Sequence, residues 1–422
     1  MGGSHRSDHE LNIETARLPR RILLGFLAVM AAVSLVATFW LWPSADDQPQ
    51  HQEYAADGVT FLSGEVVSVA EPCPVISADV NAAPAEREEF PEHCNEVVVR
   101  PESGSAKGQE VTVLATPEAS RAGVEPGDTV RIAEIPPATA DTEAVFAWVG
   151  IERNLPLGLL AIGFVIVVAV VARIRGILAL VGLGFAALVV GKFMLPALLA
   201  GENGTGVALA GSSLIMFVVL YLTHGASIRT STALAGTLVG IAITAVLGYW
   251  VVDAARLSGI SDEDGERLST FVSDISFQGL LMSAVIIAGL GVLNDVTITQ
   301  SSAIWELRAA GPELTRRQLF TSGMRIGRDH IASTIYTIVF AYAGTGLMVL
   351  MLLSLYERSL LDTLTDAAMA EEVARTLVTA IGLVLAVPVT TAIAAATVAG
   401  PATPSATTPA SSDATSTLPE SQ

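Results

Sequence analysis

The segment 289–346 holds most of the side chains in this chain that could bind an ion or carry a proton. It reads GLGVLNDVTITQSSAIWEL, then the basic loop RAAGPELTRRQLF, then SGMRIGRDHIASTIYTIVFAYAGTG. An ionisable group at membrane depth is costly unless it is paired or hydrated. The acidic, basic, amide and hydroxyl groups in these two apolar stretches therefore predict either a buried ion-pair clasp or a polar cavity that binds an ion or a small anion.

On a helix, Asp295, Thr299 and Ser302 follow one another at steps of four and three, so they form one polar stripe. A helix that faces lipid cannot carry such a stripe, which must therefore point at protein or water. We expect Asp295 to face Arg325 or Arg328 of the next span. The full set of candidate site residues is Asn294, Asp295, Thr299, Ser302, Arg325, Arg328, Asp329, His330 and His224.

Composition and apolar runs indicate which elements must position these residues. Hydrophobic residues make up 51% of the chain and charged residues only 15%, which favours a polytopic membrane protein over a soluble enzyme. The net charge of −19 comes from acids in particular loops, and no basic patch with interleaved aromatics suggests nucleic-acid binding. The eight expected spans are 21–42, 155–172, 176–195, 206–223, 231–252, 279–298, 331–353 and 376–398. The first span is an uncleaved anchor, with a cleaved signal peptide as the competing interpretation.

The distribution of basic residues among the short loops predicts the orientation. The loops expected in the cytoplasm contain Arg17, Arg20, Arg21, Arg173, Arg175, Arg229, Arg308, Arg316, Arg317, Arg325 and Arg328. The opposite loops are mostly acidic, so both termini should be cytoplasmic. Lys192, near the outer end of its span, is expected to extend to the membrane interface. The expected domains are a cytoplasmic segment 1–20, the anchor 21–42, an outside domain 43–152, a seven-helix membrane domain 153–399 and a disordered tail 400–422.

The outside domain alternates β-branched runs with turn signals. Runs at 61–70, 95–100, 110–115, 129–135 and 145–151 predict five strands, arranged as a small OB-like barrel between the first two transmembrane helices. Cys73 and Cys94 are the only cysteines and both fall in this domain. An oxidising compartment favours a disulfide between them, and a metal site with His93 is the alternative.

Four segments of the chain resemble the YibE/F-like family of multi-spanning bacterial membrane proteins. They are KFMLPALLAGENG at 192–204, YLTHGASIRTSTALAGTLVG at 221–240, GLGVLNDVTITQSSAIWEL at 289–307 and SGMRIGRDHIASTIYTIVFAYAG at 322–344. The family commonly has Met where this chain has Asn294, which makes the site more polar here. The resemblance implies a bacterial cytoplasmic-membrane protein, and it brings no activity, substrate or catalytic residue with it.

Three classes of function follow from these patterns. A transporter or permease for an ion or small solute accounts for the polar stripes within several spans. A non-transporting envelope or sensory protein, which binds a partner through its outside domain, accounts for the anchored barrel. An enzyme is the weakest reading, because the chain has no HExxH, GxSxG or phosphate-loop motif. We expect no cofactor and no metal.

Overall fold

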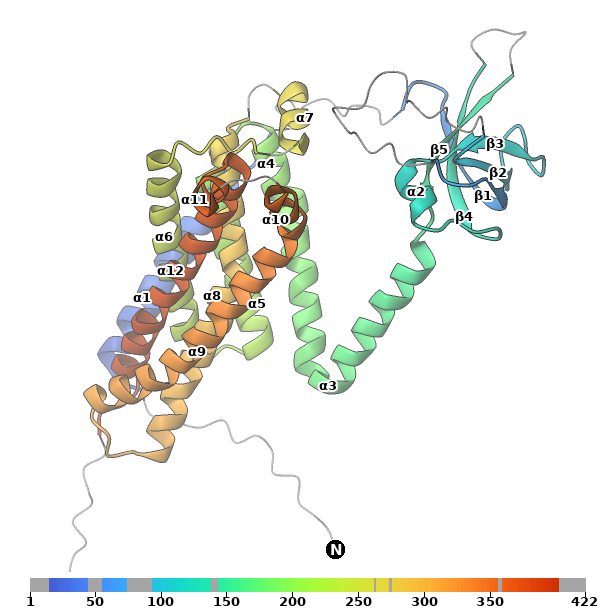
Figure 1. The fold of residues 1–422 in the computed structure, drawn as a ribbon. Coiled ribbons are helices and arrows are strands. Elements are labelled where there is room, and N and C mark those ends of the chain that lie inside the picture. The colour runs from blue at the N-terminus through green and yellow to red at the C-terminus, as the bar shows by residue number, and fades with distance from the viewer. Residues whose placement is uncertain are drawn as a thin grey trace, which may run out of the picture. The chain divides into compact units, whose positions relative to one another are not determined.

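The computed structural model of the chain describes residues 15–44, 55–73, 93–137, 143–261, 263–272, 275–355 and 359–401. These residues are mostly helical, with one small antiparallel sheet (Figure 1). The chain divides into two compact units, Gln50–Val171 and the combination of Met1–Pro49 with Ala172–Gln422. Residues 402–422 of the predicted tail lie outside the described residues, and so do residues 1–14.

The first unit contains a five-stranded antiparallel sheet with strand order β3-β2-β1-β4-β5 (Figure 1). Its strands are β1 (Thr60–Val69), β2 (Glu96–Pro101), β3 (Val111–Leu114), β4 (Thr129–Ile135) and β5 (Val145–Ile151), and the short helix α2 (Pro117–Arg121) lies between β3 and β4 in sequence. Val97, Val99, Val130 and Ile132 are fully buried because alternate side chains of a strand point to one face. The outer strands β3 and β5 also contact each other, so the sheet curls. The five predicted strands are confirmed.

Cys73 and Cys94 form a disulfide with their Cα atoms 4.8 Å apart. Cys73 follows β1 and Cys94 precedes β2, so the bond closes the insertion between the first two strands, as predicted. Residues 74–92 of that insertion lie outside the described residues. Both sulfur atoms are used in the bond, and the Nδ1 atom of His93 lies 3.0 Å from Oε1 of Glu96. The alternative of a metal site at these three residues is therefore wrong.

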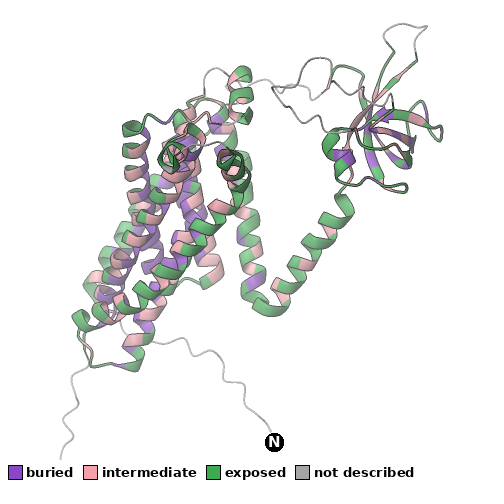
Figure 2. Ribbon diagram, in the orientation of Figure 1, coloured by how far each residue is buried: buried purple, intermediate pink, exposed green. Residues whose placement is uncertain are grey.

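The remaining elements are helices. They are α1 (Arg17–Trp40), α3 (Asn154–Val189), the π-helical turn η3 (Val190–Met194), α4 (Leu195–Leu199), α5 (Gly204–His224), α6 (Ile228–Ala254), α7 (Glu263–Phe271), α8 (Phe277–Ala310), α9 (Arg316–Thr345), α10 (Leu347–Ser354), α11 (Leu360–Leu364) and α12 (Ala367–Thr397). Figure 2 shows buried positions along α6, α8 and α12, and exposed positions along most of α3. The central helices α6, α8 and α12 pack against one another, and α9 packs on α8 and α12.

Small residues allow the central helices to approach closely. A Cβ atom added to Gly240 of α6 would lie 2.8 Å from Cδ2 of Leu293 and 3.1 Å from Cβ of Ala386, closer than such atoms can pack. Leu293 and Leu383 are almost fully buried at this junction of α6, α8 and α12. Small residues at such junctions allow close backbone approach and extensive van der Waals contact between helices.

Six helices in the described part of the chain are long and apolar enough to cross a membrane, or seven if α9 and α10, bent by 65°, form one span. The longest candidate is the continuous run Asn154–Leu199 of 46 residues, for which the sequence predicts two spans. At 1.5 Å per residue this run is about 69 Å long, more than twice the roughly 30 Å thickness of a bilayer core. Arg173 has a non-helical φ of 54° at the predicted boundary. The count of eight spans stays a prediction.

Two helices begin well before the apolar runs that indicate them. The structure begins α12 at Ala367, whereas the predicted span begins at residue 376, and begins α9 at Arg316, whereas the predicted span begins at residue 331. The extra turns at the start of α9 and α12 carry charged residues. A search for apolar runs leaves such turns out, although charged residues are compatible with a helix. Between α9 and α10 the helix axis breaks at Gly346, within the predicted span 331–353.

Candidate functional site

The candidate site lies between α8 and α9, which are connected by a short turn with arginines in the adjoining helix ends. Nη1 of Arg308 donates hydrogen bonds to the backbone oxygens of Pro312 and Leu314, both at 2.8 Å. Thr315 then caps α9 reciprocally with Gln318, each side chain bonding to the other residue's backbone. The first four backbone N–H groups of a helix have no hydrogen-bond acceptor within that helix, and a capping box satisfies two donors at this end. The turn therefore fixes the chain's reversal from α8 into α9.

A buried amide fixes the position of α9 along α8 and α12. Nε2 of Gln300, whose side chain is 2% exposed, donates to the backbone oxygen of Gly323 at 2.8 Å and to Oγ1 of Thr391 at 2.7 Å. Gly323 and Gly327 give this amide the space it needs, because a Cβ atom on Gly327 would lie 2.7 Å from Cγ1 of Val387. One side chain thus joins three helices.

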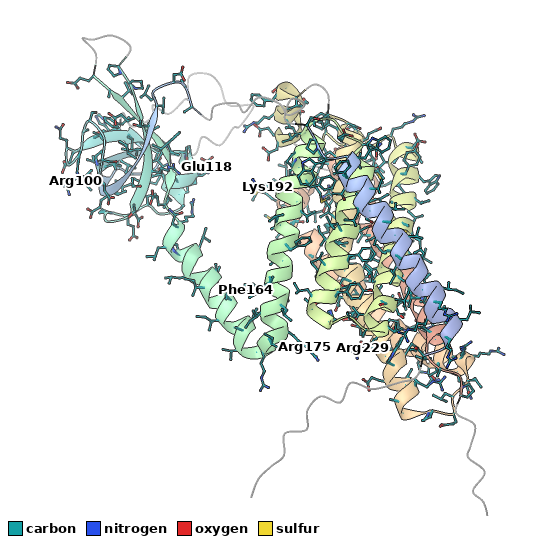
Figure 3. The ribbon with its side chains drawn as sticks, turned by 180° about the vertical axis from the view of Figure 1, so that it is seen from behind. Arg100, Glu118, Phe164, Arg175, Lys192 and Arg229 are labelled. Carbon is teal, nitrogen blue, oxygen red and sulfur yellow. A yellow bond between two sulfur atoms is a disulfide. The ribbon has the colours of Figure 1, made fainter. Side chains whose placement is uncertain are left out.

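Two further hydrogen bonds join α8 to α6. The hydroxyl groups of Thr237 and Thr297 lie 2.6 Å apart, and Oγ of Ser301 donates to the backbone oxygen of Arg229 at 2.8 Å. Ser301 is therefore level with the first turn of α6. Figure 3 shows Arg229 and Arg175 toward one end of the helical unit and Lys192 toward the other. Lys192 is exposed in η3.

Asp295 of α8 meets His330 of α9 above this level. Oδ2 of Asp295 lies 3.7 Å from Nε2 of His330, and the two side chains are 69% and 29% exposed, respectively. Asp295 precedes Ser301 by six residues, so it lies about 9 Å further along α8 than the start of α6. Oδ1 of Asn294 and Nε2 of His330 are both buried, and neither atom has a hydrogen-bond partner among the described residues. The site therefore offers a carboxylate, an imidazole and an amide oxygen with unused bonding capacity.

The structure brings together only part of the predicted set. Thr299 is exposed and Ser302 half-buried along the stripe that begins at Asp295. The side chains of Arg325, Arg328 and Asp329 are exposed, on a different face of α9 from buried Gly323 and Gly327. Among the described residues, the group that contacts the Asp295 carboxylate is His330, and the expectation that Arg325 or Arg328 faces Asp295 across a cavity stays a prediction. His224 is exposed at the end of α5, where its Nδ1 atom lies 2.7 Å from Oγ1 of Thr223.

Sequence reasoning missed the buried polar contacts that support the site. Gln300 lies further round α8 than the stripe that begins at Asp295, so the stripe did not indicate its contacts. Thr391 follows Pro388 in an otherwise apolar run, where the repeated Thr at 390 and 391 was the one signal of a polar contact. Glu371 belongs to the mostly acidic loops expected on the side opposite the cytoplasm. Glu371 is 5% exposed, and its carboxylate accepts hydrogen bonds from the Gly259 N–H and the Ser261 hydroxyl, both at 2.8 Å. Glu371 therefore joins the start of α12 to the segment that follows α6.

The long apolar helices and the polar residues buried between them are typical of a membrane protein. The family model described as YibE/F-like protein matches residues 160–400, more than half of the chain, and the chain belongs to this family. The match includes α8, α9 and α12, and so the whole candidate site. No curated protein and no solved structure matches the chain.

Proposed function

We propose that this protein is a transporter or permease that passes an ion or small solute across the bacterial cytoplasmic membrane. The observation that carries the proposal is the contact between Asp295 and His330, which lies partway along α8 and α9 rather than at the ends of the bundle. Ionisable residues in spanning helices are rare, and they commonly mark substrate or proton pathways.

The geometry of this contact favours a binding role over a structural clasp. At 3.7 Å the two groups are too far apart for a hydrogen bond, and the carboxylate is mostly exposed. An ion pair of this kind contributes little to stability. A carboxylate at membrane depth nevertheless needs water or a partner, so Asp295 belongs in a hydrated cavity. The unused Oδ1 atom of Asn294 would supply a second oxygen to a cation or a hydrogen-bonding solute.

Two observations support a topology with both termini in the cytoplasm. The Ala16 N–H donates to the backbone oxygen of Thr397 at 2.9 Å, and Thr15 pairs with Val398, so the start of α1 and the end of α12 lie on one side. The basic residues of α1, α6 and the turn between α8 and α9 belong to that same end, as the positive-inside rule requires of a cytoplasmic face. With α3 counted as two spans and α9 with α10 as one, the chain crosses the membrane eight times.

The sheet unit supports a second candidate function, a non-transporting envelope or sensory role. Its disulfide suits an oxidising compartment outside the cytoplasm. The strand order, the contact between β3 and β5 and the helix α2 between β3 and β4 support an OB-like barrel. Such a unit could bind an envelope protein while the helices only anchor it. We propose neither catalysis nor nucleic-acid binding for either unit.

Flux measurements on purified protein in proteoliposomes separate the two candidates. We expect uptake of at least one member of a panel of monovalent cations, divalent cations, protons and small anions above that of protein-free vesicles. The variant Asp295→Asn keeps the side chain's size and removes its charge, so it should abolish that uptake. Glu313→Gln, which makes the same carboxylate-to-amide change at an exposed residue of the turn between α8 and α9, serves as the matched control. Uptake equal to that of protein-free vesicles for the whole panel would favour the envelope role.

A further inference from the structure

A row of exposed polar or small residues winds along α9, beside the exposed side chains of Tyr336, Val339 and Phe340. Every fourth residue from 325 onward is exposed, and together they form a continuous ridge that we call the α9 ridge. Its members are Arg325, Asp329, Ser333, Thr337, Ala341 and Thr345. We propose that the α9 ridge binds the same ridge of a second copy of this chain, related by a two-fold axis along the membrane normal.

The depth of the ridge makes lipid an unsuitable neighbour. Asp329 is adjacent to His330, which meets Asp295 about 9 Å along the bundle from the first turn of α6. The ridge residues that follow Asp329 lie deeper still. By itself α9 is not apolar enough to qualify as a span, and it does so only together with α10. The charged side chains of Arg325 and Asp329 must be covered by protein or water at this depth, whereas the hydroxyl groups of Thr337 and Thr345 donate to backbone oxygens of α9 itself.

The side chains of the ridge suit close contact with another helix. Residues four apart form the ridges by which helices interdigitate, and Ser333, Thr337 and Ala341 are small enough to let two backbones approach. The aromatic rings of Tyr336 and Phe340 stand beside the ridge and stack on each other with centroids 6.4 Å apart. They would flank the contact rather than block it.

The charges of the ridge are complementary to the ridge itself. Neither Arg325 nor Asp329 forms an ion pair with another described residue, although the two are one helical turn apart on the same face. In a parallel two-fold pair, Arg325 of one copy would lie about 6 Å along the axis from Asp329 of the partner subunit, within reach of the long arginine side chain. The same contact then forms twice, as an isologous interface requires.

The chain's own apolar segments do not offer such a partner. The first half of α3, residues 155–171, reads LPLGLLAIGFVIVVAVV and contains no charged, amide or hydroxyl side chain. It could cover the ridge only by leaving Arg325 and Asp329 unpaired. A second copy provides both charges at the required spacing.

Cysteine cross-linking in native membranes tests the contact. Thr337→Cys should form a disulfide-linked dimer on mild oxidation, because residue 337 lies at the centre of the ridge. Val246→Cys is the matched control, since Val246 is 69% exposed on the central helix α6 and belongs to no proposed interface. Equal dimer yields for the two variants would overturn the proposal. A cross-link within one chain, formed when Thr337→Cys is combined with Val165→Cys, would overturn it too.

Charge exchange tests the pairing without depending on any one variant's stability. Arg325→Asp makes the ridge wholly acidic and Asp329→Arg makes it wholly basic, so each variant should repel its own copies. Co-expressed with different affinity tags, the two variants should co-purify at least about tenfold better than either does with itself, a difference of about 1.4 kcal/mol. Melting curves of each variant confirm that it is folded. Mixed pairs that co-purify no better than like pairs would contradict the proposed contact.

Discussion

Oδ2 of Asp295 lies 3.7 Å from Nε2 of His330, and the carboxylate remains 69% exposed. The contact connects the two helices whose ends are already fixed by the Arg308 turn and the Gln300 amide. Because those buried hydrogen bonds hold α8 against α9, the bundle does not need the ion pair for its stability. The carboxylate of Asp295 and the imidazole of His330 are therefore available for binding.

Replacing Gln300 with alanine should destabilise the bundle. The change removes the hydrogen bonds to Gly323 and Thr391 and leaves buried acceptors without a donor. Losing a buried partner of this kind costs about 1–3 kcal/mol. Thermal unfolding in detergent measures the effect, and Thr299→Ala, an exposed neighbour on α8, should melt like the wild type. Equal melting temperatures for the two variants would show that the amide does not hold the helices together.

A larger residue at Gly327 should separate α9 from the bundle. The Cβ atom alone would lie 2.7 Å from Val387 and 3.0 Å from Gln300, so Gly327→Leu overpacks the contact by much more than one methyl group. Overpacking typically costs about 1–3 kcal/mol, and the whole junction is strained here. We expect a reduced yield of monodisperse protein on size-exclusion chromatography. Gly291→Leu is the control, because a Cβ atom at Gly291 meets nothing within 4 Å.

The disulfide should protect both cysteines from alkylation in the full-length protein. It closes a loop of 21 residues in sequence. By the loop-entropy estimate, closing a loop of this length stabilises the folded sheet unit by about 3 kcal/mol. After reduction, the sheet unit should therefore be cleaved more readily by protease, while the helices are unaffected. Mass spectrometry of the unreduced protein with both thiols alkylated would contradict the pairing.

Reporter fusions should place the two termini and the sheet unit on opposite sides of the membrane. A reporter fused after Gln422 should be active only in the cytoplasm, and one inserted at Ala83 only outside it. The N-terminal end of α1 is hydrogen-bonded to the end of α12, so a reporter at residue 1 should agree with the one after Gln422. A cytoplasmic signal from Ala83 would overturn the topology.

Sequence patterns predicted the elements of this fold much better than the contacts between them. Strands β1 to β5 and the disulfide follow from alternation, turn residues and the cysteine positions, all of which act locally. The apolar runs located the long helices, but they could not reveal that α12 extends back to Ala367 or that α9 breaks at Gly346. Hydropathy reports how apolar each helical segment is, and it does not report where the helix begins or ends.

The candidate site was predicted in part for the same reason. Helical spacing placed Asp295 and Thr299 on one stripe of α8, and both residues are exposed in the structure. It could not choose between His330 and the arginines as the partner of Asp295, because that choice depends on the rotation of α9. The rotation is set by Gly323 and Gly327, whose missing side chains let α9 approach Gln300. A contact between three helices far apart in sequence leaves no local pattern.

Melting and flux measured on one preparation of Asp295→Asn test the central claim most directly. If Asp295 binds or relays the transported species, the variant should melt within about one degree of the wild type, since an exposed ion pair contributes little to stability, and its flux should fall to that of protein-free vesicles. His330→Gln, which keeps a hydrogen-bonding group at the same position, should also retain its melting temperature and lose flux. An unchanged melting curve together with undiminished flux in Asp295→Asn would contradict the account, because the carboxylate would then serve neither stability nor transport.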